Sequence, residues 1–154
     1  MRWLRRILIG IVLFNVLAVV AAQVAKRRLP TYGDQDSETF ALVAAMDGIE
    51  FVSRSEALRS GSGTAVMGGM AIDLTEVQSA DTITLDLTAI MGGIDVLVPA
   101  HWRVEMASTS IMGGTENLTD PDTAADDATV LVVDARAYLG GITVRPKSTD
   151  DQGQ

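Results

Sequence analysis

The chain has 154 residues and a net charge of −8; 47% of the residues are hydrophobic, 5% are aromatic and none is cysteine. The lack of cysteine excludes disulfides, thiol catalysis and thiolate metal sites. From Leu29 onward six Lys and Arg residues stand against twenty Asp and Glu residues, a net charge of −14. A surface this acidic excludes nucleic-acid binding, which needs clustered Lys and Arg.

Residues 1–28 are predicted to form a membrane anchor with basic flanks. Ile7–Ala25 is uncharged over 19 residues, and as a helix it would span roughly 28 Å, about the thickness of a bilayer core. A cleaved signal peptide is the alternative, but the run is longer than a usual signal core. We therefore predict a single-pass protein of the bacterial cytoplasmic membrane. Similar numbers of Lys and Arg flank both ends, so the sequence leaves open which side the domain occupies.

A polar linker, 29–38, precedes a repeat domain predicted over 39–147, and a disordered tail is predicted over 148–154. The repeat is a corner of small and apolar residues spaced by 21, 24, 21 and 27 residues, within or near the range of solenoid proteins. The five corners are Met46-Asp47-Gly48, Met67-Gly68-Gly69, Met91-Gly92-Gly93, Met112-Gly113-Gly114 and Leu139-Gly140-Gly141.

Apolar and polar residues alternate on both sides of each corner. Ile83, Leu85 and Leu87 alternate with Thr and Asp residues, and this period of two is typical of strands with one buried face. The sequence therefore predicts an all-β fold, a short right-handed parallel β-helix or solenoid of about five coils, preceded by one transmembrane helix. Polar insertions at 53–63 and 117–127 are predicted loops.

Two roles are expected for the corner residues. Glycine permits positive φ and close stacking of backbones from successive coils. The apolar residue before each glycine pair, methionine at four corners, is expected to fill the core layer beneath it, since methionine suits irregular gaps. A thioether metal stripe is the less favoured alternative.

The residues that could carry chemistry lack the partners or the spacing that a site would need. His101 is the single histidine and has no cysteine or second histidine with which to share a metal. Gly61-Ser62-Gly63 lacks the strand-to-helix context and the lysine of a phosphate-binding loop. Asp120, Asp122, Asp126 and Asp127 do not match the spacing of an EF-hand. We therefore predict no metal site and no cofactor.

Some long parallel β-helices cleave polysaccharides with paired aspartates in a groove. Asp73, Asp86 and Asp95 occupy predicted outward positions here, but outward threonines accompany them and five coils offer no long groove. We therefore predict no catalytic residues, no small-molecule substrate and no enzymatic activity.

The repeat resembles a known family. Residues 65–74, 90–99, 101–105 and 111–114, which include His101-Trp102-Arg103 and three Met-Gly-Gly corners, are similar to the C-terminal domain of LiaF-type cell-wall-active-antibiotics response proteins. The similarity extends over roughly Phe40 to Pro146. It implies a small membrane-attached β-solenoid that restrains an envelope-stress two-component system, and it implies no catalytic residues.

The sequence thus predicts a membrane-anchored, non-catalytic β-solenoid. Its predicted contacts are the membrane, through Ile7–Ala25, and a protein partner in the cell-envelope stress response or its regulation. The alternative is a self-assembling scaffold or adhesin-like envelope module, since unpaired strand edges of terminal coils can associate.

Overall fold

The computed structural model describes residues 16, 20, 31–79 and 81–147. The predicted anchor Ile7–Ala25 therefore lies outside the described residues, except for Val16 and Val20, which are helical and exposed. The predicted tail 148–154 also lies outside them. In the described part of the chain, no helix has the length and apolar character needed to cross a membrane.

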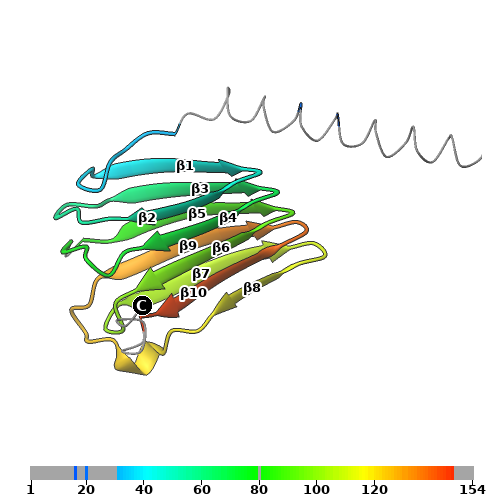
Figure 1. Cartoon of the computed structure of the whole chain (residues 1–154). Helices are drawn as coiled ribbons and strands as arrows, with labels where there is room; N and C mark the ends of the chain where they lie inside the picture. Colours follow the sequence, from blue (N-terminus) through cyan, green and yellow to red (C-terminus); the bar gives the residue numbers. More distant parts are fainter. Residues whose placement is uncertain (1–15, 17–19, 21–30, 80, 148–154) are drawn as a thin grey trace, which may run out of the picture.

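The described residues form an all-β fold, as predicted, with ten strands in two five-stranded parallel sheets (Figure 1). Sheet A holds the strand before each corner and sheet B the strand after it, and each such pair forms one coil, numbered in chain order. The strands are β1 (Thr39–Ala45), β2 (Gly48–Val52), β3 (Ser60–Val66), β4 (Gly69–Asp73), β5 (Ile83–Ile90), β6 (Gly93–Val98), β7 (Arg103–Ser110), β8 (Gly114–Asn117), β9 (Val130–Ala137) and β10 (Gly141–Pro146).

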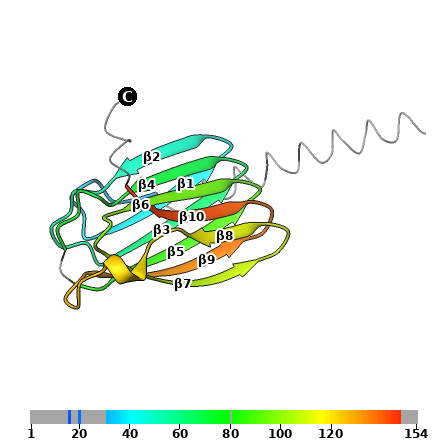
Figure 2. The ribbon, with the colours of Figure 1, turned by 90° about the horizontal axis from the view of Figure 1, so that it is seen from below.

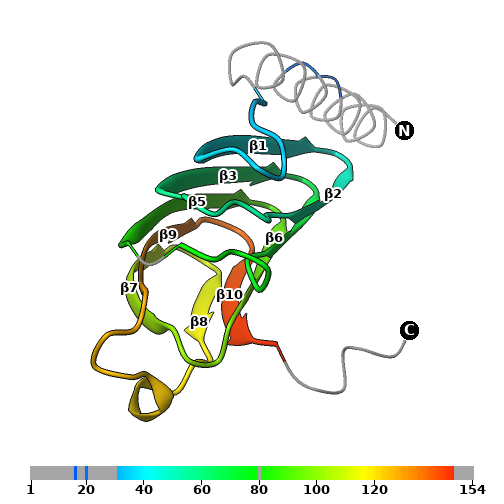
Figure 3. The same cartoon turned by 90° about the vertical axis from the view of Figure 1, so that its left-hand side faces the viewer.

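The core lies between the two sheets, which face each other in Figure 3. In β5 every second residue from Ile83 to Ala89 is fully buried, whereas Thr84 and Asp86 between them are exposed. The predicted alternation is therefore confirmed. Each fully buried Leu, Ile or Val contributes roughly 1.5–3 kcal/mol relative to exposure, so these residues fix which face of each strand turns inward.

The coils do not stack in chain order. β9 lies between β5 and β7, and β10 lies between β6 and β8, so the fifth coil is inserted between the third and the fourth (Figure 1). Leu131 and Val133 of the fifth coil are fully buried, whereas Ser108 and Ser110 of the fourth are exposed. Burying an unpaired hydroxyl costs about 1–3 kcal/mol, which explains why the more polar fourth coil ends the stack.

Ion pairs connect the inserted coil to the second and third coils. Its three basic residues each pair with an aspartate of the second or third coil, at N···O distances between 2.9 and 3.2 Å. Ion pairs that remain partly exposed, as these do, contribute about 0.2–1 kcal/mol each, so they add to the apolar burial without replacing it. The pairs are Arg136 with Asp86, Arg145 with Asp95, and Lys147 with Asp73.

Insertion of the fifth coil brings two connections together on the side opposite the corners. Pro99–Trp102 leads from β6 to β7, and the longer segment Leu118–Thr129, which includes the 3₁₀ helix η1 (Pro121–Thr123), leads from β8 back to β9 (Figure 2). The Thr123 hydroxyl donates a hydrogen bond of 2.8 Å to the carbonyl oxygen of Ala100. The polar insertion predicted over 117–127 therefore serves as the return path.

The first coil closes the opposite end of the stack. Tyr32 forms an antiparallel bridge with Ala41 of β1, with N···O distances of 3.0 and 2.8 Å. Inside this coil the rings of Phe40 and Phe51 lie 4.7 Å apart between centroids. A Cβ on Gly61 of the next coil would overlap the Phe40 ring. The bridge satisfies part of the open strand edge, as terminal coils of repeat proteins require.

Candidate functional site

The corners stack so closely that one of their two small-residue positions has no room for a side chain. The Gly93 N–H donates a hydrogen bond of 3.1 Å to the Gly68 carbonyl oxygen, and equivalent bonds join the other neighbouring corners. A Cβ on any of the four glycines at this position would overlap a backbone carbonyl of the adjacent coil. We call this position the stacked column: Asp47, Gly68, Gly92, Gly140 and Gly113.

Asp47 is tolerated in the stacked column because it belongs to the first coil, at the end of both sheets. Its carboxylate accepts a hydrogen bond of 2.8 Å from the N–H of Ala45. Ala45 is the last residue of the edge strand β1. The departure from glycine at this corner therefore serves to satisfy an edge amide that no further strand pairs.

The left-handed backbone conformation falls on the methionines, not on the glycines. φ is +62° at Met46, +54° at Met67 and Met91, and +53° at Met112, and none of the corner glycines, all of which are described, has a positive φ. The prediction that the corner glycines adopt a positive φ is therefore wrong. The prediction that they permit close stacking of backbones from successive coils is confirmed for the stacked column. This conformation costs a non-glycine residue roughly 1–2 kcal/mol, less for asparagine or glycine.

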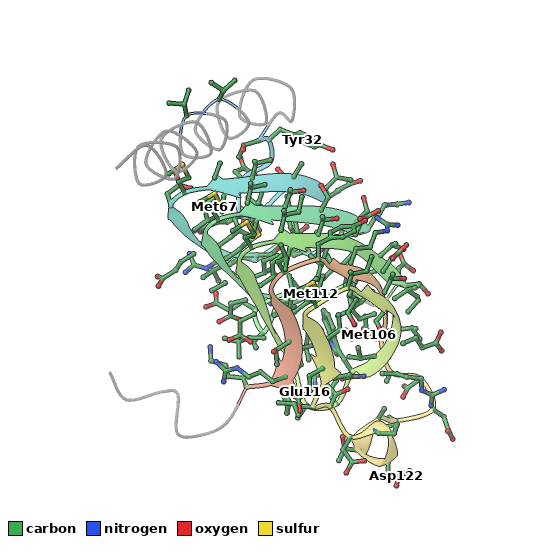
Figure 4. All side chains as sticks on the ribbon, turned by 90° about the vertical axis from the view of Figure 1, so that its right-hand side faces the viewer. Tyr32, Met67, Met106, Met112, Glu116 and Asp122 are labelled. Atoms are coloured by element: carbon green, nitrogen blue, oxygen red, sulfur yellow. The ribbon has the colours of Figure 1, made fainter. Side chains whose placement is uncertain are left out.

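Three of the four corner methionine side chains are exposed, and Met67 is partly buried. Met46 is 51% exposed, Met91 43% and Met112 83%, and Leu139 at the equivalent position is 49% exposed. The prediction that this column fills the core is therefore wrong. Figure 4 looks onto the corners, with Met67 near one end of the stack and Met112 near the other.

The residue before each of these side chains is also apolar, and Ile90, Tyr138 and Ile111 are exposed. The corners therefore present a continuous apolar surface along the stack, whose one charged residue is Asp47. We call it the corner strip: residues 45–48, 66–69, 90–93, 138–141 and 111–114, in the order of the stacked coils.

A shallow groove runs along sheet B beside the corner strip, with which it shares the second glycine of each corner. It has a volume of about 490 Å³ over four coils and continues past Gly141 toward Glu116 of the fourth. Glu50 and Asp95 lie along it. Its floor contains the second glycine of each corner, which we call the open column: Gly48, Gly69, Gly93, Gly141 and Gly114.

Neither steric contact nor backbone conformation requires glycine in the open column. A Cβ on Gly48, Gly69 or Gly114 would meet no atom within 4 Å, and on Gly93 the nearest would lie 4.0 Å away. These glycines lack a positive φ, so alanine would fit and would also reduce the conformational freedom of the unfolded chain. The groove therefore exists because of a residue choice that the fold does not impose.

The three outward aspartates Asp73, Asp86 and Asp95 each lie in an ion pair across coils. Asp73 accepts hydrogen bonds from the hydroxyl and N–H of Thr75, at 2.6 and 2.8 Å, and from the Lys147 ammonium at 3.2 Å. Partial burial raises the pKa of Asp73, but these bonds and the Lys147 charge outweigh it, so the pKa lies below its ordinary value of 3.8. Its ionised form therefore stabilises the fold.

The remaining candidates lie apart from one another. His101 is exposed in the turn between β6 and β7, and Gly61 and Gly63 lie within β3, where added side chains would strike Phe40 and Met70. Asp120 accepts a hydrogen bond of 3.0 Å from the N–H of Asp122 and so caps η1. Among the residues that the structure describes, no group of three His, Asp or Glu side chains could hold a metal ion.

Comparison of the chain with protein-family models, with curated proteins and with solved structures found no match. The corner strip is defined by the exposure of its side chains and the order of the coils. Sequence reasoning missed it because a methionine beside two glycines is compatible with either an inward or an outward side chain. The sequence signal that could have revealed the strip was the repetition of a large apolar residue at each bend.

Proposed function

We propose that this chain is a membrane-anchored, non-catalytic β-solenoid protein that acts through protein contacts in the cell-envelope stress response or its regulation. Ile7–Ala25 would cross the bacterial cytoplasmic membrane once. The coils would wind with the right-handed sense that parallel strand connections adopt.

The observation that carries the proposal is the corner strip, an exposed apolar surface on a strongly acidic domain. Large apolar surfaces of this kind mark contact sites. Two further features support it. The outward aspartates Asp73, Asp86 and Asp95 are engaged with cations of the fifth coil. The Met-Gly-Gly repeat also resembles LiaF-type response proteins, which points to an envelope-stress partner.

A self-assembling scaffold is the second candidate. β7 and β8 each end their sheet and leave one edge unpaired within the described residues, and such edges can associate. However, a continuing core would bury Ser108 and Ser110, and Tyr32 occupies part of the opposite edge. Light scattering of the full chain in detergent over a range of concentrations separates the two, because a scaffold grows in mass with concentration and a regulator does not.

Gene deletion in the source bacterium tests the proposed function. An envelope-stress reporter exposed to a cell-wall antibiotic should change several-fold on deletion and return to its original level when the full chain is supplied. An unchanged reporter would contradict the proposal. Alkaline phosphatase fused after Gln154 would establish which side of the membrane the domain occupies.

A further inference from the structure

We infer that the corner strip is the docking site for a cationic peptide segment with one apolar face, supplied by a partner protein. The inference rests on the proposed function and specifies where the partner binds and what chemistry it presents.

The residue types at the corners are the reverse of what folding alone would favour. Met46, Met67, Met91 and Met112 occupy a positive-φ position where glycine or asparagine is less strained, and three of their side chains are largely exposed. The open column beside them has glycine where alanine would fit. Backbone strain at exposed residues indicates a role outside folding. The combined result is an apolar ridge next to a groove.

The strip has the dimensions of a short helix. Its five levels are separated by about 4.8 Å each, so the strip is roughly 19 Å long. A helix of about 13 residues has the same length at 1.5 Å per residue. Helices that dock in grooves contribute one apolar face, and the groove over Gly69, Gly93 and Gly141 provides the matching depression.

The charge around the strip favours a cationic partner. Glu50 and Glu116 line the groove on the sheet B side, together with Asp95, which is paired with Arg145. The strip itself contains no lysine or arginine. From Leu29 onward the chain has a net charge of −14. Like charges disfavour a second copy of the domain and an anionic lipid surface, whereas a basic segment gains both attraction and faster association.

Methionine is well suited to this kind of contact. Its unbranched thioether side chain adapts to different apolar shapes, and methionine-rich surfaces recognise amphipathic segments in other proteins. Four methionines and Leu139 in one column therefore provide an apolar surface that can adjust to the partner's side chains.

The test uses the full chain in nanodiscs of neutral lipid and a fluorescent 14-residue amphipathic peptide, with leucines on one face and lysines elsewhere. Anisotropy should show saturable binding that weakens with salt. Two control peptides should bind at least about tenfold more weakly. One has the same composition in scrambled order, and the other has glutamate in place of lysine.

Two variants locate the contact. Replacing Met46, Met67, Met91 and Met112 by asparagine retains a residue that tolerates positive φ and should weaken peptide binding by about tenfold or more, with the thermal midpoint maintained. The double variant Gly69→Ala and Gly93→Ala fills the groove and should also weaken binding. The matched control, Ser62→Asn with Thr84→Asn on the outer face of sheet A, should bind like wild type.

Four outcomes would overturn the inference: no peptide binding, equal binding of all three peptides, wild-type affinity in the asparagine variant, or a wild-type dimer that this variant dissociates. Binding in detergent but not in nanodiscs would assign the strip to the bilayer surface and also overturn it. Peptide binding without a deletion phenotype would contradict the proposed function alone. A deletion phenotype that the asparagine variant fully complements would contradict the docking site alone.

Discussion

The fourth and fifth coils both have an apolar residue followed by two glycines at the corner, yet one coil ends the stack and the other lies within it. The inward residues of β9 from Leu131 to Ala137 are almost completely buried, whereas Met106 of β7 is only partly covered and Ser108 is exposed. The comparison shows that position in this solenoid follows the polarity of the inward face and not chain order. A coil with inward serines is stable at an end, where water satisfies the hydroxyls.

Truncation of an inward side chain should give the largest difference in stability loss between the two coils. Leu131→Ala removes a fully buried side chain of the fifth coil and should lower the free energy of unfolding by about 2–5 kcal/mol. Met106→Ala in the fourth coil, where the side chain is only partly buried, should cost about 1 kcal/mol or less. Denaturant unfolding followed by circular dichroism measures both. Equal losses would contradict the inserted position of the fifth coil.

Alanine substitutions in the stacked column should give a smaller difference in stability loss between the same two coils. Gly140→Ala places a methyl group against the Gly92 carbonyl inside the stack and should destabilise by about 1–3 kcal/mol. Gly113→Ala makes the equivalent contact with Gly140, but the terminal coil can move outward, so its loss should be smaller.

The adjacent position serves as the control for the stacked column. Gly114→Ala meets no atom within 4 Å and should leave the free energy of unfolding unchanged or raise it by a few tenths of a kcal/mol. Thermal unfolding of the three variants ranks them, and a large loss for Gly114→Ala would show that the open column has a structural role.

Arg145 should contribute less to the free energy of unfolding than the apolar core of the fifth coil does. Its guanidinium lies 2.9 Å from Asp95 of the third coil, and both side chains are more than a third exposed. Arg145→Met should therefore lower the free energy of unfolding by about 0.2–1 kcal/mol at low salt. The loss should shrink in 1 M sodium chloride because exposed charges are then screened. A salt-independent loss would indicate that packing of the arginine stem, and not its charge, matters.

Acid should weaken the link between the fifth and second coils. The folded state lowers the pKa of Asp73, so its ionised form stabilises the fold above the ordinary pKa of 3.8. That contribution is lost as the pH falls through the lower folded value. Between pH 5 and pH 2 the wild type should lose up to about 1 kcal/mol more than Asp73→Asn. Parallel pH profiles of the two proteins would contradict this contribution.

The strands and corners could be predicted because their signals are local. Alternation in β5 and the spacing of the glycine pairs depend only on neighbouring residues, and the structure confirms both. Stack order depends on which coils can share a core. The sequence signal for the stack order is the pair of inward serines Ser108 and Ser110, opposite the apolar β9. The expectation that a solenoid stacks successive coils runs against that signal.

The corner strip could not be derived in the same way. Whether Met91 turns inward depends on its φ, and a methionine at +54° runs against the general preference of side chains for negative φ. The groove depends on Gly69 and Gly93 having no close neighbours, which only the assembled stack reveals. Partner identity also lies beyond the sequence, since a surface shows the chemistry of its partner and not its name.

Stack order also determines the corner strip, because Tyr138 and Leu139 bridge the methionines of the third and fourth coils only if the fifth coil lies between them. The chain contains no cysteine, so paired cysteines can test this order directly. Thr84 of β5 is in register with Val132 of β9, which is in register with Glu105 of β7.

Three double-cysteine variants of the full chain, oxidised under mild conditions, provide the measurement. Thr84→Cys with Val132→Cys should form a disulfide, and Val132→Cys with Glu105→Cys should do so as the positive control, since adjacent strands lie about 4.8 Å apart. Thr84→Cys with Glu105→Cys should not, because two strand spacings exceed the roughly 7 Å that a disulfide spans between Cα atoms. A disulfide between positions 84 and 105, with none between 84 and 132, would contradict the inserted fifth coil.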